Sequence, residues 1–131
     1  IDVYTHELRP FTEKYGIHFI FLVTPETPED RIRKIDEMSD GFIYAVSSSS
    51  VTGRDTGEAE KEAYFKRLKS YRLKSPVLIG FGIKNESTFN QACRYVNGAI
   101  VGTAFVQRIE TERNFDLAVK DLKLSLGVTG L

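Results

Sequence analysis

Four short segments of the chain are almost continuously apolar, and the segments between them carry apolar residues at helical spacing. Continuous apolar runs, rather than alternating ones, are typical of parallel strands that are covered on both faces. We therefore expect four strands, within Ile17–Val23, Gly41–Ser47, Pro76–Gly82 and Gly98–Val106.

Five helices are expected around these strands. They are an opening helix with Phe11 and Tyr15, one that starts at Thr27-Pro28, one over Glu58–Leu73, one capped by Asn85, and a last one from Phe115 to Leu126. Thr27 and Asn85 can accept hydrogen bonds from the free N–H groups of a first helical turn. Glycine tolerates the left-handed backbone that ends many helices. We therefore expect helix ends at Gly16, Asn97-Gly98 and Gly127.

Strict alternation of helices and strands predicts an α/β fold with a parallel sheet and right-handed crossovers. Two architectures fit this order, a doubly wound open sheet and a barrel. A complete (β/α)8 barrel needs about 250 residues, and this chain has 131. We expect residues 1–131 to form a single partial domain, a half-barrel of four strands. The first residue is Ile1 rather than Met, and we expect further sequence upstream.

Composition narrows the range of functions. Lys plus Arg and Asp plus Glu both number 18, so no charge excess favours nucleic acid or a membrane surface. Cys93 is the only cysteine, which excludes an internal disulfide and is consistent with the cytoplasm. The sequence contains no apolar run of the roughly 20 residues that span a bilayer. His6 and His18 have no plausible metal partners nearby in sequence, and we predict no metal site.

Glycines at the ends of the last two expected strands point to an anion. Gly80-Phe81-Gly82 ends the third strand, and Gly102-Thr103 ends the fourth. Glycines allow backbone N–H groups to approach a phosphate closely, and barrel enzymes commonly hold phosphate after their last two strands. One such motif is more often a tight turn. Two on consecutive strands favour a phosphate site.

Two further features have open interpretations. The polar loop from Ser48 to Gly57 is either a lid over the site or a surface connector. Tyr44, in the middle of a strand, either lines a pocket or is a core aromatic residue. No paired carboxylates stand at strand ends, so no acid–base couple is visible.

Four segments, in this order, make the chain resemble the C-terminal half of the tryptophan synthase α subunit. They are Ile20–Pro25, Gly41–Ser47 continuing to Val51-Thr52-Gly53, Gly80–Ile83 and Gly98–Val106. The resemblance implies a (β/α)8 TIM barrel, with this chain running from after strand 4 through strand 8. It also implies a lyase of tryptophan biosynthesis that cleaves indole-3-glycerol phosphate to indole and glyceraldehyde 3-phosphate, without a cofactor.

The resemblance assigns roles to individual residues. Leu22 and Tyr44 match positions that line the indole and glycerol pocket, and Thr52 matches a lid threonine that supports a catalytic aspartate. Thr103 replaces the more usual serine and keeps its hydroxyl, whereas Ser48 replaces an arginine. The positions that match the surroundings of the substrate phosphate are Gly53, Gly80, Phe81, Gly82, Gly102 and Thr103.

The family's catalytic glutamate and aspartate come from strand 2 and the loop after it, outside this chain. We therefore expect the chain to bind the substrate without cleaving it, and a full-length form to pair with a β subunit. Two alternatives stay open. One is another phosphate-binding barrel, such as an isomerase, an epimerase or indole-glycerol-phosphate synthase, although the Val51-Thr52-Gly53 loop favours the first interpretation. The other is a non-catalytic half-barrel.

An isolated half-barrel has two unpaired sheet edges, which favour pairing with another chain. We expect Ile43, Ile79 and Ile100 to face the barrel interior and to leave an exposed apolar surface. Such a chain should form a homodimer or aggregate.

Overall fold

The computed structural model describes residues 1–46, 57–80 and 82–129. Its sheet contains β1 (Phe21–Val23), β2 (Ile43–Val46), β3 (Val77–Gly80) and β4 (Gly98–Ile100). All three pairings are parallel, and the spatial order β1-β2-β3-β4 is the order in the chain. A doubly wound sheet reverses its strand order at a switch point. The sequential order found here excludes that alternative and matches an arc of a barrel.

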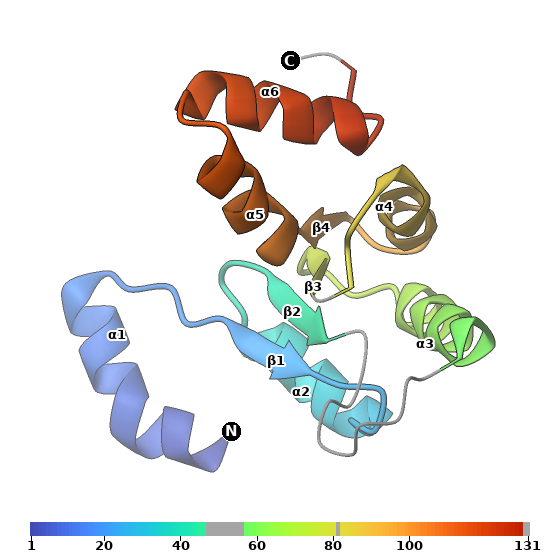
Figure 1. The fold of residues 1–131 in the computed structure, drawn as a ribbon. Helices are drawn as coiled ribbons and strands as arrows, with labels where there is room; N and C mark the ends of the chain where they lie inside the picture. Colours follow the sequence, from blue (N-terminus) through green and yellow to red (C-terminus); the bar gives the residue numbers. More distant parts are fainter. Residues whose placement is uncertain (47–56, 81, 130–131) are drawn as a thin grey trace.

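Helices connect and follow the strands, as expected (Figure 1). The helices are η1 (Tyr4–Leu8), α1 (Arg9–Tyr15), α2 (Glu29–Met38), α3 (Glu58–Ser70), α4 (Glu86–Cys93), α5 (Thr103–Thr111) and α6 (Phe115–Ser125). The short π-helix before α1 and helix α5 after β4 were not predicted as separate helices, whereas the last helix was. None of the helices in the described ranges is long and apolar enough to cross a membrane.

Several predicted helix ends are confirmed. The Asn85 side chain accepts a hydrogen bond from the backbone N–H of Thr88 at 3.1 Å, and Thr88 Oγ1 accepts one from the Asn85 N–H at 3.2 Å. This reciprocal pair is a capping box. Gly16 and Gly127 have φ values of +62° and +70°, so each takes the left-handed conformation that glycine permits at a helix end.

Two boundary predictions are wrong. Pro28, not Thr27, is the N-cap residue of α2. Thr27 instead accepts a hydrogen bond from the Thr24 N–H at 2.8 Å and so closes the turn after β1. Helix α4 ends before Asn97, whose side chain accepts a hydrogen bond from the Val77 N–H at 2.9 Å. Thr27 therefore accepts from an N–H group in a turn, and Asn97 accepts from an N–H group of a strand. Neither side chain caps a helix.

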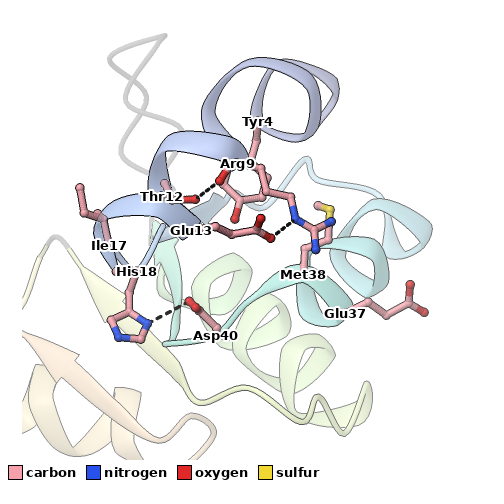
Figure 2. A pocket seen from close by; sticks show the side chains of 10 residues that line it. Tyr4, Arg9, Thr12, Glu13, Ile17, His18, Glu37, Met38 and Asp40 are labelled. Atoms are coloured by element: carbon pink, nitrogen blue, oxygen red, sulfur yellow. Dashed lines mark hydrogen bonds and ion pairs between the residues drawn. The ribbon is translucent and has the colours of Figure 1, made fainter.

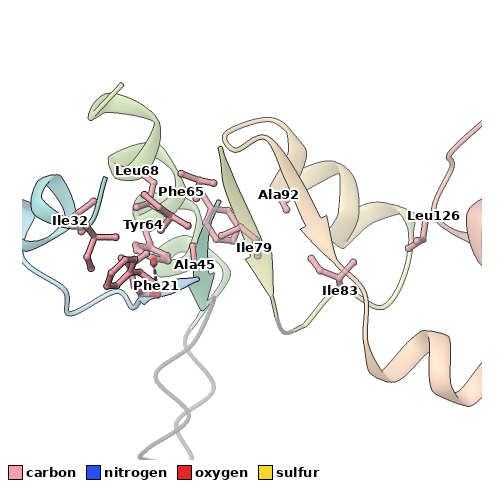
Figure 3. Packing of buried hydrophobic residues seen from close by; sticks show 14 residues of the cluster. Phe21, Ile32, Ala45, Tyr64, Phe65, Leu68, Ile79, Ile83, Ala92 and Leu126 are labelled. Atoms are coloured by element: carbon pink, nitrogen blue, oxygen red, sulfur yellow. Dashed lines mark hydrogen bonds between the residues drawn. The ribbon is translucent and has the colours of Figure 1, made fainter. Parts of the chain in front are cut away.

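Helices α2, α3 and α4 cover one face of the sheet and complete a core there (Figure 3). Ile43 and Ile79 are 0% exposed and belong to this core, so the prediction that they face the barrel interior is wrong. The alternation of side chains along a strand puts their neighbours on the opposite face. That second face carries Leu22, Tyr44, Leu78 and Ile100, and Leu22 is 60% exposed.

Candidate functional site

A pocket of about 520 Å³ lies at the carboxyl ends of β3 and β4, beside the start of α5. Carboxyl ends of parallel strands are where α/β proteins place their ligand sites. Four predicted site residues meet here. The described lining consists of Tyr44, Gly82, Ile83, Lys84, Ile100, Gly102, Thr103, Ala104 and Gln107.

Tyr44 reaches this pocket because Gly80 makes room for it. Gly80 is in register with Val46 on the neighbouring strand, and it is buried. A Cβ atom built on Gly80 would overlap the Tyr44 hydroxyl and two ring carbons. The absent side chain therefore lets the Tyr44 ring lie across β3 toward the pocket. Gly80 itself is not among the described lining residues.

The pocket floor includes the start of α5. Gly102 is the N-cap residue of α5, and its carbonyl accepts hydrogen bonds from the Phe105 and Val106 N–H groups. The first N–H groups of any helix have no partner within the helix and favour negative charge. Gly82 adds backbone in the left-handed region, with φ of +77°. This arrangement suits an anion at the Gly102 and Thr103 end.

The remaining predicted residues lie elsewhere or are not described. Leu22 is next to Tyr44 in the sheet register but is not among the lining residues. Ser48, Thr52, Gly53 and Phe81 lie outside the described residues, so their predicted roles stay predictions.

Sequence reasoning missed five lining residues, Ile83, Lys84, Ile100, Ala104 and Gln107. Lys84 follows the Gly-Phe-Gly-Ile motif directly, and a cation beside a predicted phosphate loop was the available signal. It is the only charged residue in the described lining. The Lys84 backbone N–H donates a hydrogen bond to Thr88 Oγ1 at 3.0 Å. This bond joins Lys84 to the first turn of α4.

A second pocket, of about 460 Å³, lies near the amino ends of β1 and β2 (Figure 2). It contains an exposed ion pair, Arg9–Glu13 at 2.8 Å, and an exposed contact between His18 Nδ1 and the Asp40 carboxylate at 3.1 Å. Within the described ranges, no group of three or more His, Cys, Asp or Glu side chains could hold a metal ion. Barrel proteins use the amino-end face for stability rather than catalysis, so we place the functional site at the other end.

Three side chains of α3, Glu62, Tyr64 and Lys66, have shifted pKa values, and none of them lines the carboxyl-end pocket. The hydrogen bond and charge of Lys66, followed by the Tyr95 hydroxyl, hold the pKa of Glu62 below its ordinary value. Burial raises the pKa of the Tyr64 hydroxyl, which therefore stays protonated at neutral pH.

Comparisons with known proteins agree with one another. A family model described as "Tryptophan synthase alpha chain" matches residues 3–127. The chain is 50% identical over 110 residues to the tryptophan synthase alpha chain of Flavobacterium johnsoniae, covering 83% of this chain and 44% of that relative. The solved tryptophan synthase subunit alpha from Campylobacter jejuni has a TM-score of 0.72 at 31% identity, covering 90% of this chain and 47% of that one. The tryptophan synthase complex from Pyrococcus furiosus gives 0.71 at 27% identity, with 93% and 48% covered. The chain thus spans about half the length of the relatives that it matches.

Proposed function

Because the chain belongs to the tryptophan synthase alpha chain family, we propose that it holds the phosphate end of indole-3-glycerol phosphate in the pocket at β3 and β4. The whole protein would then act as a carbon–carbon lyase that releases indole and glyceraldehyde 3-phosphate. The observation that carries the proposal is the meeting of Gly82, Gly102, Thr103 and Tyr44 around one pocket. Three of these residues come from glycine motifs at strand ends, and Tyr44 comes from a neighbouring strand.

The residues divide between the two ends of the substrate. We assign the phosphate to the backbone around Gly82 and to the start of α5 at Gly102 and Thr103, where free N–H groups can donate to its oxygens. Tyr44 and Leu22, neighbours on the open face of the sheet, would contact the indole and glycerol parts. Gly53, Gly80 and Phe81 complete the phosphate surroundings in this proposal, and Thr52 supports the lid.

The cleavage step requires more than this binding surface. Breaking the bond between indole C3 and the glycerol chain requires a proton at C3 and removal of a proton from the adjacent hydroxyl, so that the carbonyl of glyceraldehyde 3-phosphate can form. The described lining contains no carboxylate that could relay these protons. We therefore propose that the chain binds the substrate without turning it over. The β subunit of tryptophan synthase is the proposed partner of the whole protein, and the cytoplasm is its proposed location.

Calorimetric titration with glyceraldehyde 3-phosphate tests the site. An added Cβ atom at Gly102 meets no protein atom within 4 Å, so Gly102→Val should preserve the fold and obstruct only a ligand. We expect this variant to weaken binding at least about tenfold, the effect of losing one or two charge-assisted hydrogen bonds. Arg9→Ala, which removes an exposed side chain beside the pocket at the amino ends of the strands, should bind like the wild type.

Two results would contradict the proposal. One is a wild-type chain that does not bind the phosphate compound, or a Gly102→Val variant that binds it equally well. The other is cleavage of indole-3-glycerol phosphate by this chain alone at a rate that Tyr44→Phe or Thr52→Val abolishes. That result would show that the catalytic groups lie within these 131 residues.

A further inference from the structure

Helix α3 is bonded to the main chain at the carboxyl end of β1. The Tyr64 hydroxyl donates a hydrogen bond to the Val23 carbonyl at 3.3 Å. One helical turn later, the Arg67 guanidinium donates to the Pro25 carbonyl. Figure 3 shows Tyr64 directed from α3 toward β1. Two donors on one face of α3 therefore hold two carbonyls on either side of Thr24.

These donors are themselves held in place. Tyr64 is 4% exposed and belongs to the core between the sheet and α3. The Arg67 guanidinium lies over the Tyr64 ring, 5.4 Å from its centre, a cation–π arrangement that restricts both side chains. Because burial raises the pKa of the Tyr64 hydroxyl, the hydroxyl remains a donor through the neutral pH range. The pair is thus a rigid support rather than a surface contact.

The main chain that Tyr64 and Arg67 hold follows directly after Leu22, a predicted site residue. Leu22 immediately precedes Val23, and its Cα is in register with that of Tyr44, which lines the pocket. After Val23 the chain turns at Thr24, where the Thr27 hydroxyl accepts from the Thr24 N–H. That local bond shapes the turn but does not attach it to the rest of the molecule. The two bonds from α3 make that attachment.

We propose that Tyr64 and Arg67 are positioning residues, which fix the carboxyl end of β1 so that Leu22 stays beside Tyr44 at the indole end of the site. This inference rests on the proposed function. It goes beyond that function because neither residue lines the pocket. It predicts a selective effect: loss of the support weakens contacts with the indole part and leaves the phosphate contacts at β3 and β4 unchanged.

The test compares two ligands on the whole chain. Arg67→Met should weaken binding of indole-3-glycerol phosphate about tenfold, as expected for loss of one hydrogen bond from a charged donor. It should leave glyceraldehyde 3-phosphate binding within about twofold of wild type, within the error of such comparisons. Tyr64→Phe should act in the same direction, and Arg67→Lys should restore part of the loss. Lys66→Met is the matched control, since it removes a cation from the exposed side of the same helix.

Hydrogen exchange gives an independent measure of the support. The backbone amides of residues 22–24, 26 and 27 should exchange faster in Arg67→Met than in Lys66→Met, with the amides of β3 unchanged. Equal weakening of both ligands would indicate general destabilisation and would overturn the inference, as would unchanged affinity for indole-3-glycerol phosphate. In either case, wild-type binding of glyceraldehyde 3-phosphate would leave the proposed function standing. If the wild-type chain binds neither ligand, both proposals fail.

Discussion

Replacing Gly80 by alanine tests whether this residue is a glycine because of Tyr44. The added Cβ atom would overlap the Tyr44 hydroxyl oxygen, Cζ and Cε1. Strand pairing places Val46 opposite Gly80, so the backbone has little freedom to withdraw and the ring must move. Overpacking of this kind costs about 1–3 kcal/mol. We expect Gly80→Ala to lower the free energy of unfolding by that amount, measured by urea denaturation followed by circular dichroism.

The second half of the experiment places the same change in a chain without the ring. In a Tyr44→Ala background none of the three overlapping atoms exists, so Gly80→Ala should be neutral or should stabilise by up to about 1 kcal/mol, through the lower entropy of the unfolded chain. Tyr44→Phe removes only the hydroxyl, so most of the cost should remain. Equal costs in the wild-type and Tyr44→Ala backgrounds would show that Gly80 is required for another reason.

Three further predictions concern a helix cap, a titration and the sheet edges. Asn85→Ala should destabilise the chain by about 1 kcal/mol, because Thr88 loses its capping partner; an unchanged melting temperature would contradict the capping role. Tyr95→Phe should raise the pKa of Glu62 toward its ordinary value, followed by NMR titration, and a pKa that stays equally low would assign the whole effect to Lys66. The stabilisation from ionised Glu62 is present above its ordinary pKa and is lost as pH falls through the lowered value. Since β1 and β4 each have one unpaired edge within the described sheet, the purified chain should sediment as a dimer or larger species, and a stable monomer at all concentrations would refute this.

The order of elements could be predicted from the sequence, whereas the direction of side chains on the strands could not. A strand that is apolar at every position gives the same pattern whichever face points to the helices. For that reason Ile43 and Ile79 were expected on the barrel side, and the structure places them in the core beneath α2, α3 and α4. Tyr44, the one polar-tipped residue of β2, lies on the other face. Its hydroxyl was the better guide to that face.

The parts of the candidate site that are formed by glycine-rich backbone could be predicted from the sequence. The parts that are formed by side chains of α5 could not, because they depend on where that helix lies. The motifs around Gly82 and Gly102 indicated the pocket because glycine has few uses other than turns and close approach. Ala104 and Gln107 line the pocket only because of the direction in which α5 leaves β4, and this direction depends on packing against α6. Tyr64 contacts the last residue of β1 and Arg67 contacts Pro25 in the turn that follows, both across about forty residues of sequence. A local pattern does not indicate such contacts.

The strictly sequential strand order has a consequence for how the chain folds. In the ranges that the structure describes, one helix lies between each pair of neighbouring strands. Each pairing therefore closes a loop of modest length, and the entropy lost on closure grows slowly with that length. Each βα unit can therefore add to the one before it as it becomes available, without waiting for a distant part of the chain. Each pairing still joins residues 20 or more positions apart, and parallel pairing of this kind is slow compared with local contacts. We expect the sheet to assemble stepwise along the chain, in the direction in which a ribosome would deliver it.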